Sequence, residues 1–237
     1  MKPCVAIPIF DHGATIASVV EALAPLGLPC LIVDDGSSRP TQERLAELTR
    51  QHVWVRMERH EHNRGRGAAL RTAYRRAHSE GFSHVVQLDA DGQHDARDVP
   101  RFLEAAQRDP RALVLGEPIF DRSAPAIRLY GRELSKAIVR LQTLSGAVHD
   151  PLCGFRCIPL RPTVALLDAT RFGSRMEFDP ELVVRLVRAG VPVVNVPTAV
   201  DYPLGGISHF RMVEDNVRIA WAYTRLAADL VLRGARS

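Results

Sequence analysis

The chain of 237 residues is poor in several features, and each shortage excludes a class of protein. Long hydrophobic runs are missing, because Pro25, Gly27 and Pro29 interrupt the most apolar stretch before it reaches the roughly 18 residues of a membrane span. No charged-then-apolar leader precedes the first strand-like segment. We therefore expect a cytoplasmic protein that does not cross a bilayer unaided.

Cysteine is scarce, with four residues in the whole chain. Cys4 and Cys30 fall in strand-like runs, and the pair Cys153 and Cys157 has no second pair with which to complete a zinc site. This distribution favours buried thiols in a reducing compartment.

Lysine is nearly absent, since Lys2 and Lys136 are the only two, and aromatic residues make up 6% of the chain. Almost all of the positive charge behind the net charge of +4 is therefore arginine, which suits bidentate recognition of phosphate groups. No basic block is interleaved with aromatic residues, so the composition argues against a nucleic-acid groove. An anionic nucleotide or a lipid head group is the expected partner.

Strand-like and helix-like patterns alternate along the first half of the chain, which predicts the α/β class with a mostly parallel central sheet and helices on both faces. We expect strands at residues 4–10, 29–35, 53–57, 85–88, 112–116 and 193–196. Helices are expected at residues 14–23, 41–50, 67–79, 125–145, 180–189 and 212–233. An irregular Pro-Gly-Cys stretch lies between the long helix and the next one. No repeat or low-complexity linker divides the chain, so one domain is predicted.

Two carboxylates follow the apolar strand at residues 85–88. Asp89 and Asp91 form an Asp-x-Asp pair, and Gly92 can adopt the positive φ that turns the chain at the end of the strand. Open α/β sheets bind ligands at this edge, and Mg²⁺ or Mn²⁺ usually takes one or two carboxylates plus phosphate oxygens. The alternative is a solvated Asp-Gly turn.

A second acidic pair, Asp34 and Asp35, arrives at the same sheet edge and is followed by Gly-Ser-Ser, which leaves room for a ligand. One of these residues could instead cap the next helix. The loop Asn63-Arg-Gly-Arg-Gly67 adds glycines that permit close backbone approach and arginines that donate to anions. Its spacing matches neither a P-loop nor a Rossmann fingerprint.

These motifs together resemble a known family. They stand in the order Val5-Ala-Ile-Pro-Ile-Phe10, Val33-Asp-Asp-Gly-Ser37, Asn63-x-Gly-x-Gly67, Leu88-Asp-Ala-Asp-Gly-Gln-His94 and Asp150-Pro-Leu-Cys-Gly-Phe-Arg156. The chain resembles the inverting glycosyltransferases of family 2, which have the GT-A fold, and within them the dolichol-phosphate-mannose-synthase-like branch. The resemblance implies a single GT-A domain over 1–237, with a nucleotide-sugar-binding half at 1–116, an acceptor half at 117–211 and a C-terminal amphipathic helix at 212–237.

The resemblance also assigns roles to the residues of the donor site. Asp89 is expected at the ribose or the metal, and Asp91 at the divalent ion, Mg²⁺ or Mn²⁺, which bridges the diphosphate. Gln93 and His94 would support this loop, with His94 favoured as a positioning residue over a metal ligand. The expected nucleotide-binding residues are Pro8, Phe10, Asp34, Asp35, Asn63, Arg66, Gly67, Asp89 and Ala90.

Catalysis with inversion requires a base that deprotonates the acceptor hydroxyl, unless the acceptor is already an anion such as a phosphate. The segment Met176-Glu-Phe-Asp-Pro-Glu181 resembles the acidic stretch of the family, so Asp179 is the first candidate base and Glu181 the second. Asp179 could equally cap the following helix. Basic residues in glycine-bounded loops are candidates for contacts to the phosphates or the acceptor: Arg156, His209 and Arg211.

We therefore predict a metal-dependent inverting glycosyltransferase that moves a hexosyl or N-acetylhexosaminyl group from a UDP- or GDP-sugar to a lipid-linked or amphiphilic acceptor. Phe10 and Asp11 stand where many family members have Tyr-Asn, and Arg66 where lysine is usual, so the nucleotide stays open. The alternatives are a sugar-1-phosphate nucleotidyltransferase, which should carry a Gly-rich basic loop after the first strand, and a non-catalytic nucleotide-sugar-binding protein.

The C-terminal helix at residues 212–233 has two interpretations. It carries apolar residues together with charges of both signs, such as Trp221 and Arg225. Such a helix could lie on a membrane surface as a peripheral contact, or it could pack against its own domain.

Overall fold

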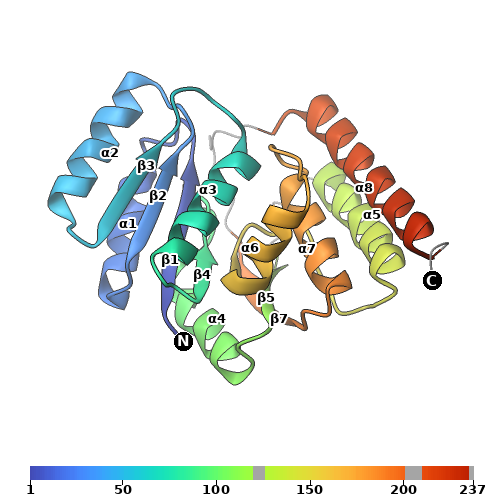
Figure 1. The fold of residues 1–237 in the computed structure, drawn as a ribbon. Helices are drawn as coiled ribbons and strands as arrows, with labels where there is room; N and C mark the ends of the chain where they lie inside the picture. Colours follow the sequence, from blue (N-terminus) through green and yellow to red (C-terminus); the bar gives the residue numbers. More distant parts are fainter. Residues whose placement is uncertain (120–125, 201–209, 235–237) are drawn as a thin grey trace.

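A computed structural model of the chain describes residues 1–119, 126–200 and 210–234. Seven strands form one sheet in the order β3-β2-β1-β4-β6-β5-β7 (Figure 1). The strands are β1 (Pro3–Ile9), β2 (Cys30–Asp34), β3 (Val55–Arg59), β4 (His84–Gln87), β5 (Leu113–Ile119), β6 (Arg156–Pro159) and β7 (Val193–Ala199). All neighbouring pairs are parallel except those that β6 makes with β4 and β5. The α/β class and the mostly parallel sheet expected from the alternating pattern are confirmed.

The central strands are apolar on both faces because helices cover both sides of the sheet. In β1, Cys4 and Ala6 belong to one core cluster, whereas Val5, Ile7 and Ile9 belong to the other. This division follows from the alternation of side chains along a strand. The first core lies under α3, α5, α6, α7 and α8, and the second lies under α1, α2 and α4.

The helices follow the strands in the order that the sequence pattern indicates. They are α1 (Ile16–Leu23), α2 (Arg39–Gln51), α3 (Arg66–Ser79), α4 (Val99–Arg108), α5 (Ala126–Thr143), α6 (Leu160–Ala169), α7 (Phe178–Arg188) and α8 (Met212–Gly234). Short 3₁₀ helices lie at η1 (Ala24–Leu26) and η2 (Ala96–Asp98). Most bounds lie within two residues of those expected from the sequence.

Three elements were not expected from the sequence: α4, β6 and α6. The stretch expected to be irregular contains β6, an antiparallel strand that joins the two halves of the sheet, followed directly by α6. β6 has only four residues, runs from an arginine to a proline, and is buried at every position. Its sequence therefore shows neither alternation nor a long apolar run, and its neighbours in the sheet define it as a strand.

Candidate active site

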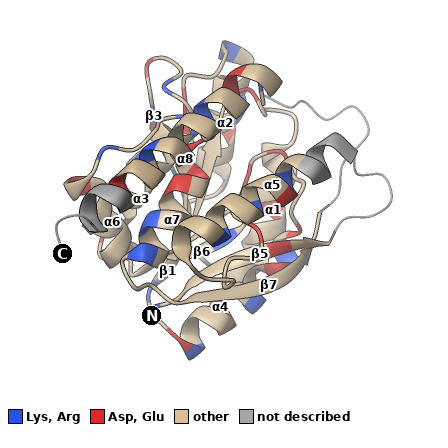
Figure 2. Ribbon diagram, turned by 90° about the vertical axis from the view of Figure 1, so that its right-hand side faces the viewer, with Lys and Arg blue, Asp and Glu red and all other residues tan. Residues whose placement is uncertain are grey.

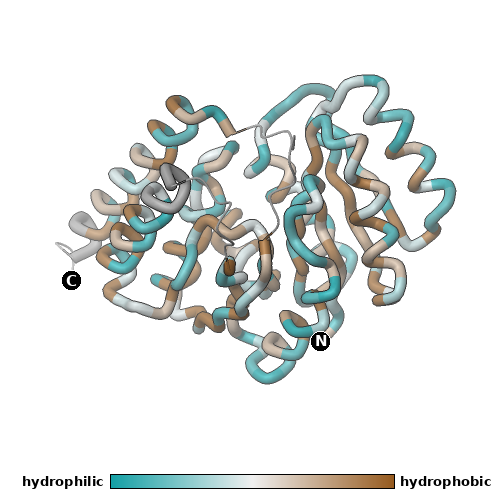
Figure 3. Tube along the Cα trace, turned by 180° about the vertical axis from the view of Figure 1, so that it is seen from behind, coloured by the Kyte–Doolittle hydropathy of each residue, from teal (hydrophilic) through white to brown (hydrophobic). Residues whose placement is uncertain are grey.

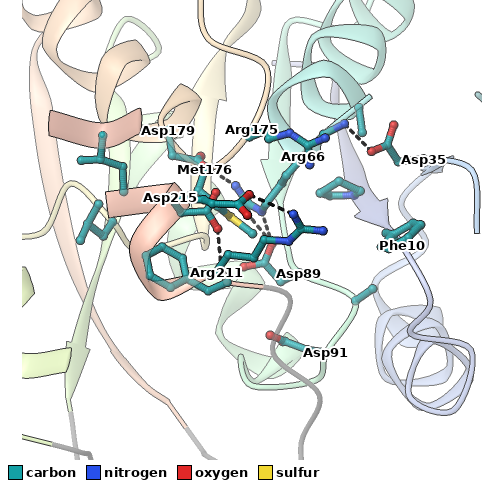
Figure 4. A pocket seen from close by; sticks show the side chains of 18 of the residues that line it. Phe10, Asp35, Arg66, Asp89, Asp91, Arg175, Met176, Asp179, Arg211 and Asp215 are labelled. Carbon is teal, nitrogen blue, oxygen red and sulfur yellow. Dashed lines mark hydrogen bonds and ion pairs between the residues drawn. The ribbon is translucent and has the colours of Figure 1, made fainter. Parts of the chain in front are cut away.

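The carboxyl ends of β1, β2 and β4 meet at one edge of the sheet and deliver the acidic residues there. Asp35 follows β2, and Asp89 and Asp91 follow β4, with Gly92 at a φ of 74° directly after them. Figure 4 shows Asp89 in the middle of the pocket, with Phe10 and Asp35 on one side and Asp91 below. The sequence pattern predicted this shared edge, and the structure brings the acidic residues of the two strands to a common cavity.

Arg66 connects the acidic residues of the two halves of the chain. It is the first residue of α3, follows Gly65 at a φ of 99°, and donates to Asp89 Oδ1 through Nε at 3.2 Å and through Nη2. Its Nη1 donates to Asp179 Oδ2. The guanidinium therefore bridges a carboxylate of the Asp-x-Asp segment and a carboxylate at the start of α7.

A second arginine, Arg156, also contacts Asp179. Arg156 Nη1 lies 3.0 Å from Asp179 Oδ1, and the Gln87 side-chain amide donates to the same oxygen at 3.3 Å. Arg156 also donates to the carbonyls of Cys153 and Pro151, each at 2.7 Å, and its side chain is fully buried. Both oxygens of Asp179 are thus held by guanidinium groups. Arg156 itself supports the floor of the site and does not line the pocket.

Asp35 holds the loop that begins α3. Its Oδ1 lies 2.7 Å from His60 Nδ1 and accepts from the backbone N–H of Arg64 at 3.0 Å, while Oδ2 accepts from Gly65 N–H at 2.7 Å. Asp34 is fully buried and pairs with Arg59 at 2.8 Å, away from the pocket. The two neighbouring carboxylates therefore differ: Asp35 borders the pocket and shapes its loop, and Asp34 supports the strand end.

The pocket has a volume of about 780 Å³. Most of the residues predicted for the site line it: Pro8, Phe10, Asp35, Asn63, Arg66, Asp89, Ala90, Asp91, Gln93, Asp179 and Arg211. Four predicted residues do not line it: Asp34, Gly67, Arg156 and Glu181. The last predicted residue, His209, lies outside the described residues.

Glu181 and Gly67 are packed against other parts of the chain and do not line the pocket. Glu181 is fully buried, accepts from Gly173 N–H at 3.0 Å and pairs with Arg185 at 2.9 Å and Arg225 at 3.0 Å. These contacts close it off from the cavity, so Asp179 is the only one of the two expected bases that can face a substrate. Gly67 lies against Phe178, where a Cβ atom would come within 2.4 Å of the phenylalanine Cβ.

The two acids of the Asp-x-Asp segment differ in their charge environment. Burial would raise the pKa of Asp89, but Arg66 and His94 outweigh it and hold that pKa below its usual value. Burial and the nearby Asp89 raise the pKa of Asp91 to about 6. Asp91 is therefore a carboxylate that lacks sufficient positive charge around it, which suits a residue that binds a cation.

The donor set fits a metal ion that arrives together with a substrate. Among the described residues no group of three or more His, Cys, Asp and Glu side chains could hold an ion without further ligands. Asp91 lines the cavity beside Asp89, and Gln93 follows on the same loop, with its N–H bonded to Asp91 Oδ1 at 3.0 Å. One or two carboxylates completed by phosphate oxygens and water are the usual ligands of Mg²⁺.

The second half of the chain contributes residues to the pocket that the motifs did not reveal. Arg175 and Met176 precede α7, and the Arg175 Nη1 donates to the Asn63 side chain at 3.4 Å. Arg132 of α5 also lines the cavity and pairs with Asp150 at 2.6 Å. For Arg175 a signal was present, because it follows Gly173-Ser174 directly before the acidic segment. Arg132 stands on a helix, and its neighbours in the sequence do not distinguish it from a solvated arginine.

Arg211 reaches the pocket from the start of α8. Its backbone N–H donates to Asp215 at 2.7 Å, and its guanidinium donates to Glu214 at 2.9 Å. Figure 4 shows Arg211 and Asp215 across the cavity from Phe10 and Asp35. Loops of the first half of the chain therefore border the pocket together with residues from the helices of the second half.

Comparison with solved structures identifies the class of fold. A mannosyltransferase from Pyrobaculum calidifontis in complex with GDP-Man and Mn²⁺ superposes with a TM-score of 0.61 at 17% identity. The match covers 86% of this chain and 58% of that one, so this chain spans less than two thirds of the solved structure. The expected GT-A fold is confirmed, and the pocket lies at the carboxyl edge of its sheet.

The sequence comparison identifies the family. The chain belongs to glycosyl transferase family 2, whose model matches residues 4–160. It is 28% identical over 231 residues to a polyprenol monophosphomannose synthase of Mycolicibacterium smegmatis, covering 92% of this chain and 84% of the relative. It is 27% identical over 191 residues to an undecaprenyl-phosphate mannosyltransferase of Micrococcus luteus, covering 74% and 73% of the two chains. The family expected from the ordered motifs is confirmed.

None of the helices that the structure describes is both long enough and apolar enough to cross a membrane.

Proposed function

We propose that the protein is an inverting glycosyltransferase that moves a sugar from a UDP- or GDP-sugar to the phosphate group of a lipid. The observation that carries the proposal is the meeting of Asp89, Asp91, Arg66 and Asp179 in one cavity of about 780 Å³. The size suits a nucleotide-sugar, and the charges suit a diphosphate with its cation. The names of the two mannosyl-transferring relatives support a lipid-phosphate acceptor.

The nucleoside would lie against Pro8 and Phe10, beside the loop that Asp35 organises. The diphosphate would then extend toward Asp91, which would hold Mg²⁺ or Mn²⁺ with phosphate oxygens as the remaining ligands. A bound ion supplies positive charge to the departing nucleoside diphosphate. The Pyrobaculum mannosyltransferase, which shares this fold, was solved with GDP-Man and Mn²⁺, and this supports a nucleotide-sugar and a divalent ion as ligands. We propose either UDP or GDP as the nucleotide of this chain.

The position of Asp179 favours an acceptor that needs no base. Its two oxygens are occupied by Arg66 and Arg156, and a carboxylate held between two guanidinium groups is a weak proton acceptor. A phosphate acceptor is already an anion and can attack the sugar carbon without losing a proton. We therefore propose that Asp179 positions Arg66 at the reaction centre, and that inversion follows from attack opposite the leaving diphosphate.

A polyprenyl-phosphate acceptor stays in a bilayer, so the proposed reaction requires peripheral contact of the enzyme with a membrane. The arginines at the acceptor side of the cavity, Arg132 and Arg211, would attract the acceptor phosphate.

Two measurements on the full chain test the proposal. The first is calorimetric titration with UDP, GDP, CDP and ADP, in Mn²⁺ and then in EDTA; we expect one of UDP and GDP to bind, and only with the metal. The second follows a labelled sugar from the matching donor to polyprenyl phosphate or to the unphosphorylated polyprenol. We expect transfer to the phosphate alone. Transfer to the free alcohol at an equal rate would contradict a base-free reaction, and binding of no nucleotide would contradict the proposal as a whole.

A further inference from the structure

The outward side of α8 is apolar. Val213, Val217 and Trp221 lie at i, i+4 and i+8, on one stripe of the helix. They are 77%, 63% and 64% exposed. Large side chains that recur on one exposed face indicate an interaction site, whereas scattered ones need no explanation.

Three charged residues of α8, Asp215, Arg225 and Asp229, point into the protein, whereas Glu214 and Arg218 are exposed. Arg225 donates to the fully buried Glu181 at 3.0 Å, and Asp229 pairs with Arg185 of α7 at 3.3 Å. Asp215 is also buried. A helix on the surface of a water-soluble protein usually turns its charges outward and its apolar side inward. In α8 ion pairs secure the inner face alongside its apolar contacts, and large apolar side chains are left outside.

The neighbouring helix α5 extends this apolar side. Leu134 and Leu141 of α5 and Leu144 just after it are 54%, 72% and 81% exposed. The two helices lie against each other, and the Gln142 side chain donates to the Tyr223 carbonyl at 2.7 Å. Figures 1 and 3 show them together at the end of the molecule that carries the C-terminus, with hydrophobic segments along both. We refer to Leu134, Leu141, Leu144, Val213, Val217 and Trp221 as the α5–α8 apolar face.

The α5–α8 apolar face borders the pocket. Gly131 and Ser135 of α5 line the cavity, and so do Met212, Asn216 and Ile219 of α8. The same two helices therefore form the acceptor side of the pocket and carry the exposed apolar residues. A substrate delivered along this face reaches the cavity without crossing the rest of the surface.

We propose that the α5–α8 apolar face docks on the surface of a lipid bilayer, which presents the acceptor to the pocket; this inference rests on the proposed function. Trp221 suits the boundary between lipid tails and head groups, where its ring is apolar and its N–H meets water. Away from the pocket, α5 carries Lys136 and the exposed Arg140 with one acidic residue, Glu133, which leaves a net positive charge that complements anionic lipids. Figure 2 views the molecule from this side and shows the charged positions on both helices.

The charge of α5 also distinguishes a bilayer from a second copy of the chain. A symmetric dimer through this face would bring the two basic α5 helices together, and like charges at an interface oppose association. An anionic membrane has the opposite sign over its whole area.

Sedimentation with vesicles of phosphatidylcholine and phosphatidylglycerol that contain no polyprenyl phosphate tests the docking. The full chain should bind, and a higher share of phosphatidylglycerol should tighten binding. The double substitution Val217→Gln with Trp221→Gln should weaken binding at least about tenfold, because two apolar side chains no longer enter the lipid. Val53→Gln is the matched control, since Val53 is 92% exposed between α2 and β3, and it should bind as the wild type does.

Fluorescence locates the contact. Trp54 and Trp221 are the only tryptophans, so Trp54→Phe leaves Trp221 as the sole reporter. Its emission should shift to the blue when vesicles are added. Binding without any shift, or no binding at all, would overturn the proposal. A dimer in sedimentation equilibrium without vesicles that the double substitution dissociates would also overturn it, in favour of self-association.

The outcomes separate this inference from the proposed function. Metal-dependent nucleotide binding by the double variant should equal that of the wild type, because neither residue lines the pocket. If the chain binds vesicles through Trp221 but binds no nucleotide, the proposed function fails and the docking stands. If it transfers sugar to a detergent-dispersed acceptor but never binds vesicles, the docking fails and the function stands.

Discussion

Arg66 in the first turn of α3 forms an ion pair with Asp179 in the first turn of α7, across 113 positions of sequence. The same guanidinium pairs with Asp89, and Arg156 supports Asp179 from beneath. Two carboxylates and two arginines thus form a continuous series of ion pairs, in the order Asp89, Arg66, Asp179 and Arg156. Because each buried charge has partners of opposite sign, the group can stay ionised with little exposure to water.

Replacing Asp179 tests whether this residue positions Arg66 or deprotonates the acceptor. Asp179→Asn should leave the nucleotide affinity unchanged and lower kcat about 10- to 100-fold, the range of residues that support a catalytic group. The pH profile of kcat should keep its shape, because the reaction loses no base. A loss of about 10³-fold or more that also removes the acidic limb of the profile would show that Asp179 is the base.

Asp91→Asn should abolish the metal dependence of donor binding. The titration of the variant in Mn²⁺ should match that of the wild type in EDTA, because the amide is a poor ligand for the ion. The ligand-free variant should also unfold at a higher temperature, since burial and Asp89 raise the pKa of Asp91 to about 6 and its charge is costly at neutral pH. Asp95→Asn is the control on the same loop, where asparagine can still cap η2. Equal metal-dependent affinity in the Asp91 variant would remove Asp91 from the proposed metal site.

Gly154→Ala should disturb the pair between Arg66 and Asp89. A Cβ atom at this position would lie 2.1 Å from Asp89 Oδ2 and 3.0 Å from Arg66 Nη2. We expect a loss of about 1–3 kcal/mol in the free energy of unfolding, together with weaker donor binding. At Gly146 a Cβ atom would meet nothing within 4 Å, so Gly146→Ala should leave both quantities close to wild type. Urea unfolding and nucleotide titration measure the two effects.

The four buried thiols should make the protein sensitive to alkaline pH. Burial raises the pKa of Cys4, Cys153 and Cys157 to about 12 and that of Cys30 further. The unfolded chain therefore loses its thiol protons first, and the stabilisation present below about pH 9 should decrease progressively as the pH rises toward 12. Urea unfolding as a function of pH measures this slope.

The same thiols should resist alkylation by iodoacetamide at neutral pH in the folded protein, and all four should react in urea. Rapid alkylation of the native protein would contradict the buried placement.

The motifs at the carboxyl ends of β1, β2 and β4 were predictable because they are local. A buried strand followed by acids and glycine has the same geometry wherever it occurs, and parallel strands bring such ends to one edge. The roles of Arg156 and Glu181 were not predictable in the same way. Both were candidates for the site, yet both are fully buried in contacts to residues far along the sequence. Nothing in the neighbouring residues distinguishes an arginine that supports an active-site floor from one that binds phosphate.

The sequence by itself determined the α/β class, the order of most elements, the family and the acidic edge, because strand burial, helix periodicity and glycine turns depend on short segments. The tertiary structure decided which charges meet. It placed Asp179, and not Glu181, at the pocket, set β6 between the two halves of the sheet, and turned the ion pairs of Arg225 and Asp229 inward while Trp221 faces outward. These outcomes depend on packing between segments distant in the sequence, 44 positions apart for Glu181 and Arg225 and 113 for Arg66 and Asp179, where burial and the position of opposite charges decide the function of a side chain.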